Sequence, residues 1–452
     1  MELAEKNILV VGLGKSGLAV ARFAAHKGAI VTVTDLSDAA ALAAHVPELK
    51  KMGTRLVLGE HPPDIFKQAE LIVVSPGVPH TIKPLTLARK AGIPVMGELE
   101  FASRFILEPV VAVTGTNGKT TTTALLGKML ACSGKQVFVG GNIGNPLIEY
   151  VEKGAAADVV VLEVSSFQLD TASTFRAHVA VLLNISADHL DRYDGFAAYA
   201  LSKGKIFENQ APEDTAVINR MDPEVKKLAA TCRAAVKPFF HAGRNGTVTD
   251  AGAEIFTDRI LIHTGAKPLI LDLQQAPLTG THNHENIAAA ALAALAAGGS
   301  TAGIQKAIDT FRGLAHRLEA VATINGVLYV DDSKGTNVDA VARALETFDR
   351  PTILIMGGRD KGGDYTVLQP HLEKTVKKLV VMGEAATTIE TQLGAIAPVQ
   401  SAGDMAQAVQ LATAASDPGD VVLLSPACSS FDMYDSYSQR GEDFRQQVNT
   451  LK

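Results

Sequence analysis

Short apolar segments rich in valine, isoleucine and leucine recur along this 452-residue chain, and segments of helical pattern separate them. Each is long enough for one strand and most end at Gly, Ser, Asp or Asn; they cover residues 7–12, 29–35, 71–77, 110–115, 158–165, 179–186, 351–358, 378–383 and 420–427. Continuously apolar strands that alternate with helices are typical of parallel sheets covered on both faces. We therefore expect an α/β fold whose functional residues follow directly after the strands, where such sheets bind their ligands.

The chain is long enough for about three domains. One boundary is expected just before residues 98–100, ahead of a glycine-rich loop. A second is expected near residues 311–319, ahead of a hairpin signalled by Asn325 and Gly326. We predict a Rossmann-like domain at 1–97, a central P-loop mononucleotide-binding α/β domain at 98–312 with a small side sheet within 236–280, and a C-terminal Rossmann-like α/β domain at 313–452.

Composition narrows the class of protein. The net charge is −6 and no long basic block is present, which argues against a nucleic-acid partner. Three distant cysteines without a CxxC pair argue against disulfides or a zinc site and fit a reducing compartment. The N-terminal segment lacks the apolar region of a signal peptide, and the alanine-rich stretch at 287–297 is too short to span a bilayer. We expect a cytoplasmic protein that does not insert into a membrane.

The first glycine loop, VVGLGKSGLAVA, follows a strand and opens a helix. Gly12, Gly14 and Gly17 form G-x-G-x-x-G, and the next strand ends at Asp35. This pattern is typical of an NAD site, in which the pyrophosphate lies at the helix N-terminus and the acid binds a ribose hydroxyl. The same geometry would hold the diphosphate of a nucleotide sugar, and a βα turn without a ligand is a third interpretation. Gly77, after a later strand, would line the same pocket.

The second glycine loop, VAVTGTNGKTTTT at 111–123, is two residues shorter between its glycines than the full Walker pattern. A strand still leads into a loop of backbone N–H groups, and a helix is expected to start at about Lys119. Lys119 would neutralise phosphate charge, the Thr120 hydroxyl would reach Mg²⁺, and Thr121 would contact the phosphates. The loop indicates that a phosphate is bound and leaves its destination open.

Further magnesium ligands are expected after the next two strands. Glu163 ends one of them, and Asp188 and His189 follow the other. Mg²⁺ prefers oxygen ligands, and a histidine taken alone is more often a helix cap or a packed residue. The spacing of Lys203 by itself indicates an ordinary surface lysine.

Taken together, the motifs resemble those of the Mur ligase family, in the same order and over essentially the whole chain. They are GTNGKTTT, GGNIGNP, LEVSSFQLD, NISADHLDRY, YALSKGKIFEN, THNHENIAAA, HRLE, DDSKGTN and SPACSSFDMYDSYSQRGEDF. The short first glycine loop and the SPACSSFDMY segment are similar to the members that add D-glutamate. The DNPR motif of the diaminopimelate-adding members is absent from the sequence.

The resemblance implies an ATP-dependent amide ligase of peptidoglycan precursor synthesis. ATP would phosphorylate the carboxylate of UDP-N-acetylmuramoyl-L-alanine, and the amine of D-glutamate would attack the acyl phosphate. The first domain would bind the UDP substrate, the central domain ATP, and the third domain the amino acid together with part of ATP. Two Mg²⁺ ions and a monomeric protein are also expected.

Site residues follow from the same resemblance. Lys119, His189 and Lys203 are implied to be catalytic, and Lys203 would carry a CO₂-derived carbamate. Metal ligands would be Thr120, Glu163, His189 and the Lys203 carbamate. The residues implied for ATP are Gly115, Thr116, Asn117, Gly118, Lys119, Thr120, Thr121, Asn286, Arg317, Asp332 and Lys334.

The resemblance also assigns residues to the two other substrates. Those for D-glutamate are Thr336, Lys361, Ser430 and Tyr437, of which the last replaces a phenylalanine of the family. Those for the UDP substrate are Gly14, Lys15, Ser16, Asp35, Gly77 and Asn142. Lys15 and Ser16 replace the commoner pair of an uncharged residue and a hydroxyl residue, so the contact with the pyrophosphate stays open.

Three alternatives remain at this point. Another ligase of the superfamily, such as a folylpolyglutamate synthetase, would share the central motifs but not the SPACSSFDMY segment. A nicotinamide oxidoreductase would explain the first glycine loop and leave the second unexplained. A nucleotide switch or motor would explain the second loop but neither Lys203 nor the first loop.

Overall fold

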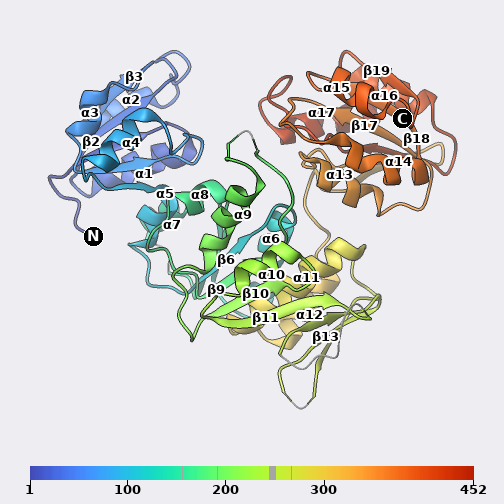
Figure 1. The fold of residues 1–452 in the computed structure, drawn as a ribbon, viewed down its shortest axis with the longest axis horizontal. Coiled ribbons are helices and arrows are strands. Elements are labelled where there is room, and N and C mark those ends of the chain that lie inside the picture. Colours follow the sequence, from blue (N-terminus) through green and yellow to red (C-terminus); the bar gives the residue numbers. More distant parts are fainter. Residues whose placement is uncertain (155, 191, 244–250, 266) are drawn as a thin grey trace. The chain divides into compact units, whose positions relative to one another are not determined.

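The computed structural model describes residues 1–154, 156–190, 192–243, 251–265 and 267–452, which form three sheets (Figure 1). By their internal contacts these residues divide into two compact units. The first unit contains Met1–Asn184, Ala200–Gln274 and Asn286–Asp309, and the second contains Ile185–Tyr199, Gln275–Glu285 and Thr310–Lys452. No helix of the described residues is long and apolar enough to cross a bilayer.

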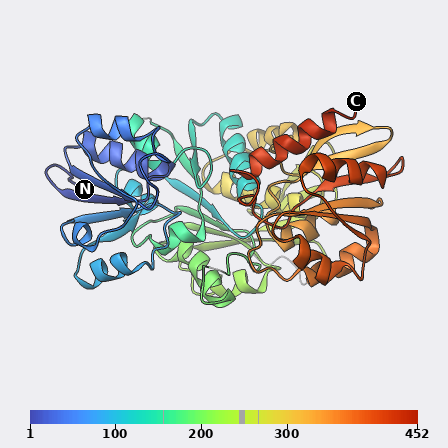
Figure 2. The same ribbon diagram turned by 90° about the horizontal axis from the view of Figure 1, so that it is seen from above.

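The first sheet is parallel throughout, with the strand order β3-β2-β1-β4-β5. Because the chain winds outward from β1 in both directions, the loop after β1 lies at the point where a Rossmann-like sheet binds its ligand. Helices lie on both faces of this sheet (Figure 2). The elements are β1 (Asn7–Val11), α1 (Lys15–His26), β2 (Ile30–Asp35), α2 (Val46–Lys51), β3 (Arg55–Leu58), α3 (Pro63–Lys67), β4 (Leu71–Val74), α4 (Lys83–Lys90) and β5 (Val95–Gly97).

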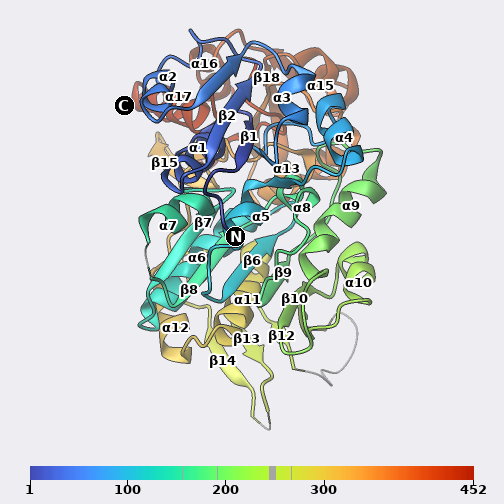
Figure 3. The same cartoon turned by 90° about the vertical axis from the view of Figure 1, so that its left-hand side faces the viewer.

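The central sheet has the order β14-β13-β12-β11-β10-β9-β6-β8-β7 among the described residues. Figure 3 shows β6 inside it, with β7 and β8 on one side and β9 and β10 on the other. The β-rich segment predicted as a small side sheet is not separate, because β12 pairs with β11, and β13 and β14 continue the same sheet as an antiparallel edge.

The strands of the central sheet are β6 (Val110–Thr114), β7 (Val137–Gly141), β8 (Val159–Glu163), β9 (Val179–Leu182), β10 (Thr215–Asn219), β11 (Ala235–His241), β12 (Ala253–Ile255), β13 (Arg259–Ile262) and β14 (Leu269–Asp272). Its helices are α5 (Glu98–Ser103), α6 (Lys119–Cys132), α7 (Leu147–Lys153), α8 (Ser166–Asp170), α9 (Phe196–Gly204), η1 (Lys205–Phe207), α10 (Pro223–Ala229), α11 (Thr281–Ala296) and α12 (Thr301–Thr310).

The third sheet has the order β15-β16-β20-β17-β18-β19, and only its first pair is antiparallel. That pair is the predicted hairpin, with Asn325 and Gly326 at positive φ as its turn requires. Its elements are β15 (Glu319–Ile324), β16 (Val327–Asp331), α13 (Val338–Leu345), β17 (Thr352–Gly357), η2 (Tyr365–Leu368), α14 (Gln369–Thr375), β18 (Val376–Met382), α15 (Ala386–Leu393), β19 (Val399–Ser401), α16 (Met405–Ala414), β20 (Val421–Leu424) and α17 (Tyr437–Asn449).

Strand β17 shows why its sequence is apolar without alternation. Ile353 and Ile355 face a core closed by α16 and α17, while Leu354 and Met356 face a second core closed by α13, α14 and α15. Successive side chains of a strand point to opposite faces, so both sets must be apolar. The Rossmann-like prediction for the first and third sheets is confirmed, as is the parallel centre of the second.

Two carboxyl groups on the short helix α5 are fully buried and have opposite surroundings. Glu98 Oε1 accepts a hydrogen bond from Ile148 N at 2.8 Å, and its Oε2 has no hydrogen-bond partner within the described residues. Burial raises the pKa of Glu98 to about 7, against the smaller effect of that N–H group. Glu100 is equally buried, but Thr174 and Arg104 side chains and the N–H groups of residues 173–175 donate to it, which lowers its pKa to about 2 despite desolvation.

Glu98 and Glu100 are expected to change the free energy of unfolding with pH in opposite ways. A raised carboxyl pKa means that the folded state holds the proton longer, so stability falls as pH rises from about 4.3 to about 7. Glu98→Gln is therefore expected to raise the free energy of unfolding at pH 8 by on the order of 2 kcal/mol, with a smaller gain at pH 5.

Glu100→Gln is the matched comparison on the same helix. Its lowered pKa contributes stability above the unfolded value that is lost as pH falls toward about 2. This variant is expected to be less stable at pH 7, with a deficit that shrinks in acid. Urea unfolding from pH 3 to 8 measures both; a Glu98→Gln effect independent of pH would contradict the explanation.

Candidate active site

The second glycine loop joins β6, which lies between β8 and β9 in the central sheet, to a helix. Strand β6 ends at Thr114, and α6 begins at Lys119, with Gly118 as its cap in the left-handed conformation. Thr120 and Thr121 are buried in the first turn of α6. The predicted start of this helix is confirmed, and the loop has the strand–loop–helix arrangement of a phosphate cradle.

Asn184, just beyond β9, fixes this loop and was not among the predicted site residues. Its side-chain oxygen accepts from Asn117 N at 2.8 Å, its amide donates to Asn117 O at 3.1 Å, and its carbonyl accepts from Thr116 N at 2.9 Å. Strand β9 pairs with β6, so a polar residue at its end lies beside the loop. That position, directly after an apolar strand, is the sequence signal that could have identified it.

Two lysines from distant parts of the chain meet at the same carbonyl oxygen. Lys119 Nζ donates to Gly115 O at 2.9 Å and to Thr116 O at 2.7 Å, and Lys203 Nζ donates to Gly115 O at 2.8 Å. Only 2% of Lys203 is exposed, so its interpretation from spacing as a surface lysine is wrong. Burial of an ammonium group must be compensated by hydrogen bonds or opposite charge, and here two ammonium groups donate to the same carbonyl oxygen.

Glu163 ends β8 directly beside β6, in register with Val113. Its Oε1 accepts from Asn142 Nδ2 at 2.8 Å, whereas its buried Oε2 has no hydrogen-bond partner among the residues described. Only 2% of the residue is exposed. A buried carboxylate oxygen without a donor fits a cation ligand, and oxygen is the donor that Mg²⁺ prefers.

Asn286, implied for ATP, lies on α11 and packs against the start of α6. Its Oδ1 accepts from Thr122 Oγ1 at 3.2 Å. A Cβ on Gly118 would lie 2.3 Å from the same oxygen. The first unit therefore brings together Lys119, Glu163, Lys203 and Asn286 around one glycine loop.

The remaining predicted residues of the nucleotide and amino-acid sites lie in the second unit. His189 has a left-handed backbone, at φ 55°, and adjoins Asp188. Asp188 Oδ2 accepts from Asn337 Nδ2 at 3.2 Å, and Lys361 Nζ lies 3.5 Å from Asp188 Oδ1. Three separate loops thus meet at one carboxylate.

A cavity of about 310 Å³ opens at this carboxylate. Thr336 and Lys361 line it, as predicted for the amino-acid substrate, together with His189. Ser430 and Tyr437 are not among its lining residues. Ser430 is buried, and the ring of Tyr437 lies under Lys334, whose Nζ is 4.9 Å from the ring centre. The structure therefore brings two of the four predicted residues together in this cavity.

The segment around Arg317 is held in an unusual conformation. His316 and Leu318, on either side of it, both have positive φ. Leu318 N donates to Asp332 Oδ1 at 3.3 Å, and Ser425 donates to Asp332 Oδ2 at 2.7 Å. Burial raises the pKa of Asp332 to about 7, while Ser425 and Arg317 act against this shift. Non-glycine residues with left-handed backbones persist where the surroundings fix them.

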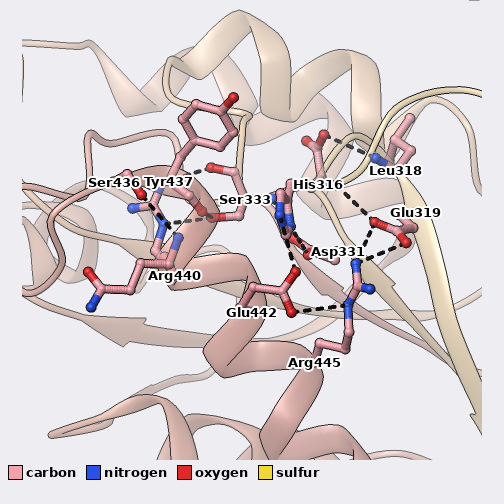
Figure 4. Close-up of polar contacts among 12 residues, drawn as sticks. His316, Leu318, Glu319, Asp331, Ser333, Ser436, Tyr437, Arg440, Glu442 and Arg445 are labelled. Carbon is pink, nitrogen blue, oxygen red and sulfur yellow. Dashed lines mark hydrogen bonds and ion pairs between the residues drawn. The ribbon is translucent and has the colours of Figure 1, made fainter. Parts of the chain in front are cut away.

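A partly buried network fixes this segment (Figure 4). His316 Nδ1 lies 2.7 Å from Asp331 Oδ2, and Glu319 accepts from His316 N and, through both oxygens, from Arg445. Nearby, the buried guanidinium of Arg440 donates to Gly357 O at the end of β17 and to the carbonyl groups of Ser333, after β16, and Cys428, after β20. His316 and Arg440 were not predicted from the sequence, because their partners are backbone groups and side chains distant in the sequence.

His316, Glu319 and Asp331 bring potential ligand atoms within 4.8 Å of one another. The histidine and the aspartate bond to each other, and the glutamate is occupied by Arg445 and a backbone N–H. We therefore interpret the cluster as a structural brace for Arg317 rather than a metal centre.

A separate cavity, of about 480 Å³, lies in the first unit above the first glycine loop. All residues predicted for the UDP substrate line it: Gly14, Lys15, Ser16, Asp35, Gly77 and Asn142. Asn142 comes from the loop after β7, so the central sheet completes a cavity that the first sheet begins. A Cβ on Gly17 would lie 1.9 Å from Gly12 O, which explains the third glycine of the pattern by close packing.

Asp35 is engaged by the backbone of its own cavity. Its Oδ2 accepts from Leu13 N at 2.6 Å and its Oδ1 from Ser37 N at 2.7 Å. Partial burial works against ionisation, but these N–H groups lower the pKa of Asp35 below its usual range. The carboxylate therefore shapes the glycine loop in addition to any contact with a ligand.

Comparison with known proteins identifies three family domains. Residues 6–97 match the Mur ligase MurD-like N-terminal domain, residues 113–294 the Mur ligase middle domain, and residues 316–428 the Mur ligase glutamate ligase domain.

Curated relatives match over the whole chain. A UDP-N-acetylmuramoylalanine–D-glutamate ligase of Desulfosudis oleivorans is 52% identical over 453 residues, covering 100% of this chain and 98% of the relative. A protein of the same name from Desulfatibacillum aliphaticivorans is 50% identical over 456 residues, covering 100% of both chains.

Solved structures share the fold at low identity. A pseudomurein peptide ligase type C from Methanothermus fervidus superposes with a TM-score of 0.63 at 21% identity, covering 99% of this chain and 100% of that one. The UDP-N-acetylmuramate-alanine ligase of Thermotoga maritima gives 0.60 at 20% identity, covering 99% and 100%.

The network of Figure 4 leads to a stability prediction at Gly441, on α17. A Cβ there would lie 2.2 Å from His316 Nδ1 and 2.7 Å from Asp331 Oδ2. Although alanine is the better helix former by about 1 kcal/mol, Gly441→Ala is expected to destabilise the second unit by about 1–3 kcal/mol because the network must move.

Gly403→Ala, in the same unit, is the control, since its Cβ would meet only a flexible glutamine side chain at 3.4 Å. Thermal and urea unfolding of both variants measure the difference. Equal stability of the two variants would show that the network tolerates displacement.

Proposed function

The chain belongs to the Mur ligase family, and we propose that it uses ATP to join D-glutamate to UDP-N-acetylmuramoyl-L-alanine. Full-length relatives at 45–52% identity carry the name of this ligase. The reaction is a step of peptidoglycan precursor synthesis, and ATP is the nucleotide of the family. The cytoplasmic location predicted from composition fits an ATP-dependent step on a UDP-linked substrate.

The observation that carries the proposal is the position of Lys203 at the phosphate loop. Its Nζ reaches Gly115 O from a helix 88 residues away, beside Lys119. A nicotinamide oxidoreductase does not require the second glycine loop. A nucleotide switch does not require a buried lysine beside its phosphate loop. A ligase brings the phosphates of ATP together with substrate carboxylates, and it needs fixed charges around these anions.

In the first step, a carboxylate oxygen of the UDP substrate attacks the γ-phosphorus of ATP. A new C–O–P linkage forms, the β,γ-bridging P–O bond breaks, and ADP leaves with that electron pair. Phosphorylation is needed because a carboxylate resists attack by an amine. The loop N–H groups and Lys119 hold the phosphates and neutralise charge that shifts toward ADP.

The metal ligands proposed are those that the family resemblance implies. Glu163, whose Oε2 has no hydrogen-bond partner among the described residues, and Thr120 would hold Mg²⁺, and His189 would be a further ligand. Bound Mg²⁺ supplies positive charge that neutralises the phosphate oxygens. Lys203 would complete the site for two ions as a carbamate, formed when its neutral amine adds to CO₂ and releases a proton.

In the second step, the neutral amine of D-glutamate attacks the acyl carbon. The tetrahedral species loses phosphate with the C–O bonding pair, the nitrogen loses a proton, and the amide remains. Thr336 and Lys361 line a cavity of suitable size for an amino acid, and Lys361 would pair with a carboxylate of the substrate. Ser430 and Tyr437 would join them only if their loops rearrange.

The proposed division of labour follows the predicted boundaries. Residues 1–97 would bind the UDP substrate, residues 98–312 ATP, and residues 313–452 the amino acid and, through Arg317, Asp332 and Lys334, part of ATP. The three separate sheets support this division.

Phosphate release with each component omitted tests the function. The complete mixture of protein, ATP, Mg²⁺, UDP-N-acetylmuramoyl-L-alanine and D-glutamate is expected to release phosphate, and omission of any one component should abolish sustained release. L-Glutamate, meso-diaminopimelate and L-alanine are the competing amino acids. Phosphate release that does not depend on D-glutamate would contradict the ligase assignment. A preference for another amino acid would indicate another ligase of the family.

Lys203→Ala tests the carbamate. Activity is expected to fall about 100-fold or more, because an anionic group at the phosphate loop is lost. Short carboxylic acids such as acetate are expected to restore part of it by occupying the vacated space. Lys226→Ala, at an exposed position of α10, is the control. Full activity without rescue would show that Lys203 is not required.

A further inference from the structure

The loop of residues 140–146, which begins at the end of β7, contributes to the cavity above the first glycine loop and to the surroundings of Glu163. Through Asn142 and Gly144 it lines the cavity above the first glycine loop. Through Asn142 it also contacts Glu163: Asn142 Nδ2 donates to Glu163 Oε1 at 2.8 Å, and Asn142 N donates to Glu163 O at 2.8 Å. A shift of this loop would therefore move a side chain in the first cavity and a carboxylate at the phosphate loop together.

Lys15 connects this loop to the first sheet. Its Nζ donates to Gly144 O at 2.7 Å and to Asn145 Oδ1 at 2.9 Å. An ammonium group has three N–H donors, and these two bonds use two of them. The same lysine lines the cavity in which a diphosphate is proposed, so the third donor can face a phosphate oxygen.

The position of Lys15 in the sequence is unfavourable for the helix that it begins. It is the first residue of α1, where the helix dipole is positive and a cation costs about 0.3–1 kcal/mol. An exposed lysine with neutral acceptors recovers little of this, because water competes for the same bonds. The placement becomes favourable when an anion binds beside it.

We propose that Lys15 is a positioning residue that links occupancy of the UDP-substrate cavity to the orientation of Glu163 at the nucleotide site. This inference rests on the proposed function and resolves the pyrophosphate contact that the sequence left open. A diphosphate held by the third N–H of Lys15 tightens the bonds to Gly144 and Asn145. The tightened loop fixes Asn142, and Asn142 fixes the carboxylate whose other oxygen faces the proposed metal.

Neighbouring ion pairs allow the proposed link through Lys15 to be distinguished from the packing of α1 against α7. Arg22, on the same face of α1, pairs with Glu152 on α7 at 2.9 Å, and His26 lies 3.2 Å from the same carboxylate. These contacts hold α1 to α7 without involving loop 140–146. Loss of Lys15 should therefore leave the docking of α1 intact, and loss of Arg22 should weaken it while preserving the link.

Equilibrium binding tests the link, because coupling between two sites is reciprocal. The affinity of the wild-type protein for AMP-PNP with Mg²⁺ is measured by calorimetry without ligand, with saturating UDP and with saturating uridine. UDP is expected to tighten nucleotide binding about fivefold or more, and uridine, which lacks phosphates, is expected to have no effect.

Three variants complete the experiment. In Lys15→Met, UDP is expected to leave the affinity for AMP-PNP unchanged, to within about onefold. The affinity for AMP-PNP in the absence of UDP and the thermal midpoint of this variant are expected to equal those of the wild type. Lys15→Arg is expected to restore part of the UDP effect, and Arg22→Gln to retain it in full. An undiminished UDP effect in Lys15→Met, or none in the wild type, overturns the inference. Failure of UDP to bind the wild type at all would instead count against the proposed function.

Discussion

The carboxyl ends of parallel strands are the constraint on which the site depends. Strand β6 lies between β8 and β9, so the residues that follow these three strands must meet at one edge of the sheet. The glycine loop follows β6, Glu163 ends β8, and Asn184 follows β9. Asn184 binds the backbone of the loop, and beside it Glu163 presents an oxygen that has no hydrogen-bond partner among the described residues. The sheet thus gathers donors and a carboxylate where phosphate and a cation would bind.

Much of this could be predicted from the sequence because strands and turns are local signals. The parallel strands, the start of α6 at Lys119, and the hairpin at Asn325 all follow from short patterns, and every residue predicted for the UDP substrate lines one cavity. Long-range packing is what sequence reasoning could not supply. Lys203 is buried because α9 returns to a loop 88 residues earlier, and β12 to β14 continue the central sheet because β12 pairs with β11.

Charged groups are buried at several of these edges, and the surroundings of each decide its effect. Glu100 receives enough hydrogen bonds to remain ionised, whereas Glu98 and Asp332 are desolvated and hold their protons to about pH 7. Lys203 is a buried group that can carry the opposite charge. Functional sites commonly retain such costs, because the groups that destabilise the fold are those that act on a charged substrate.

The central claim is that the γ-phosphoryl group passes to a substrate carboxylate before the amide forms. An isotope experiment tests it most directly: UDP-N-acetylmuramoyl-L-alanine labelled with ¹⁸O in both oxygens of its terminal carboxylate is turned over with ATP and D-glutamate, and the released phosphate is examined by mass spectrometry. An acyl phosphate predicts one ¹⁸O atom in each phosphate and one left in the amide. Unlabelled phosphate would contradict the account.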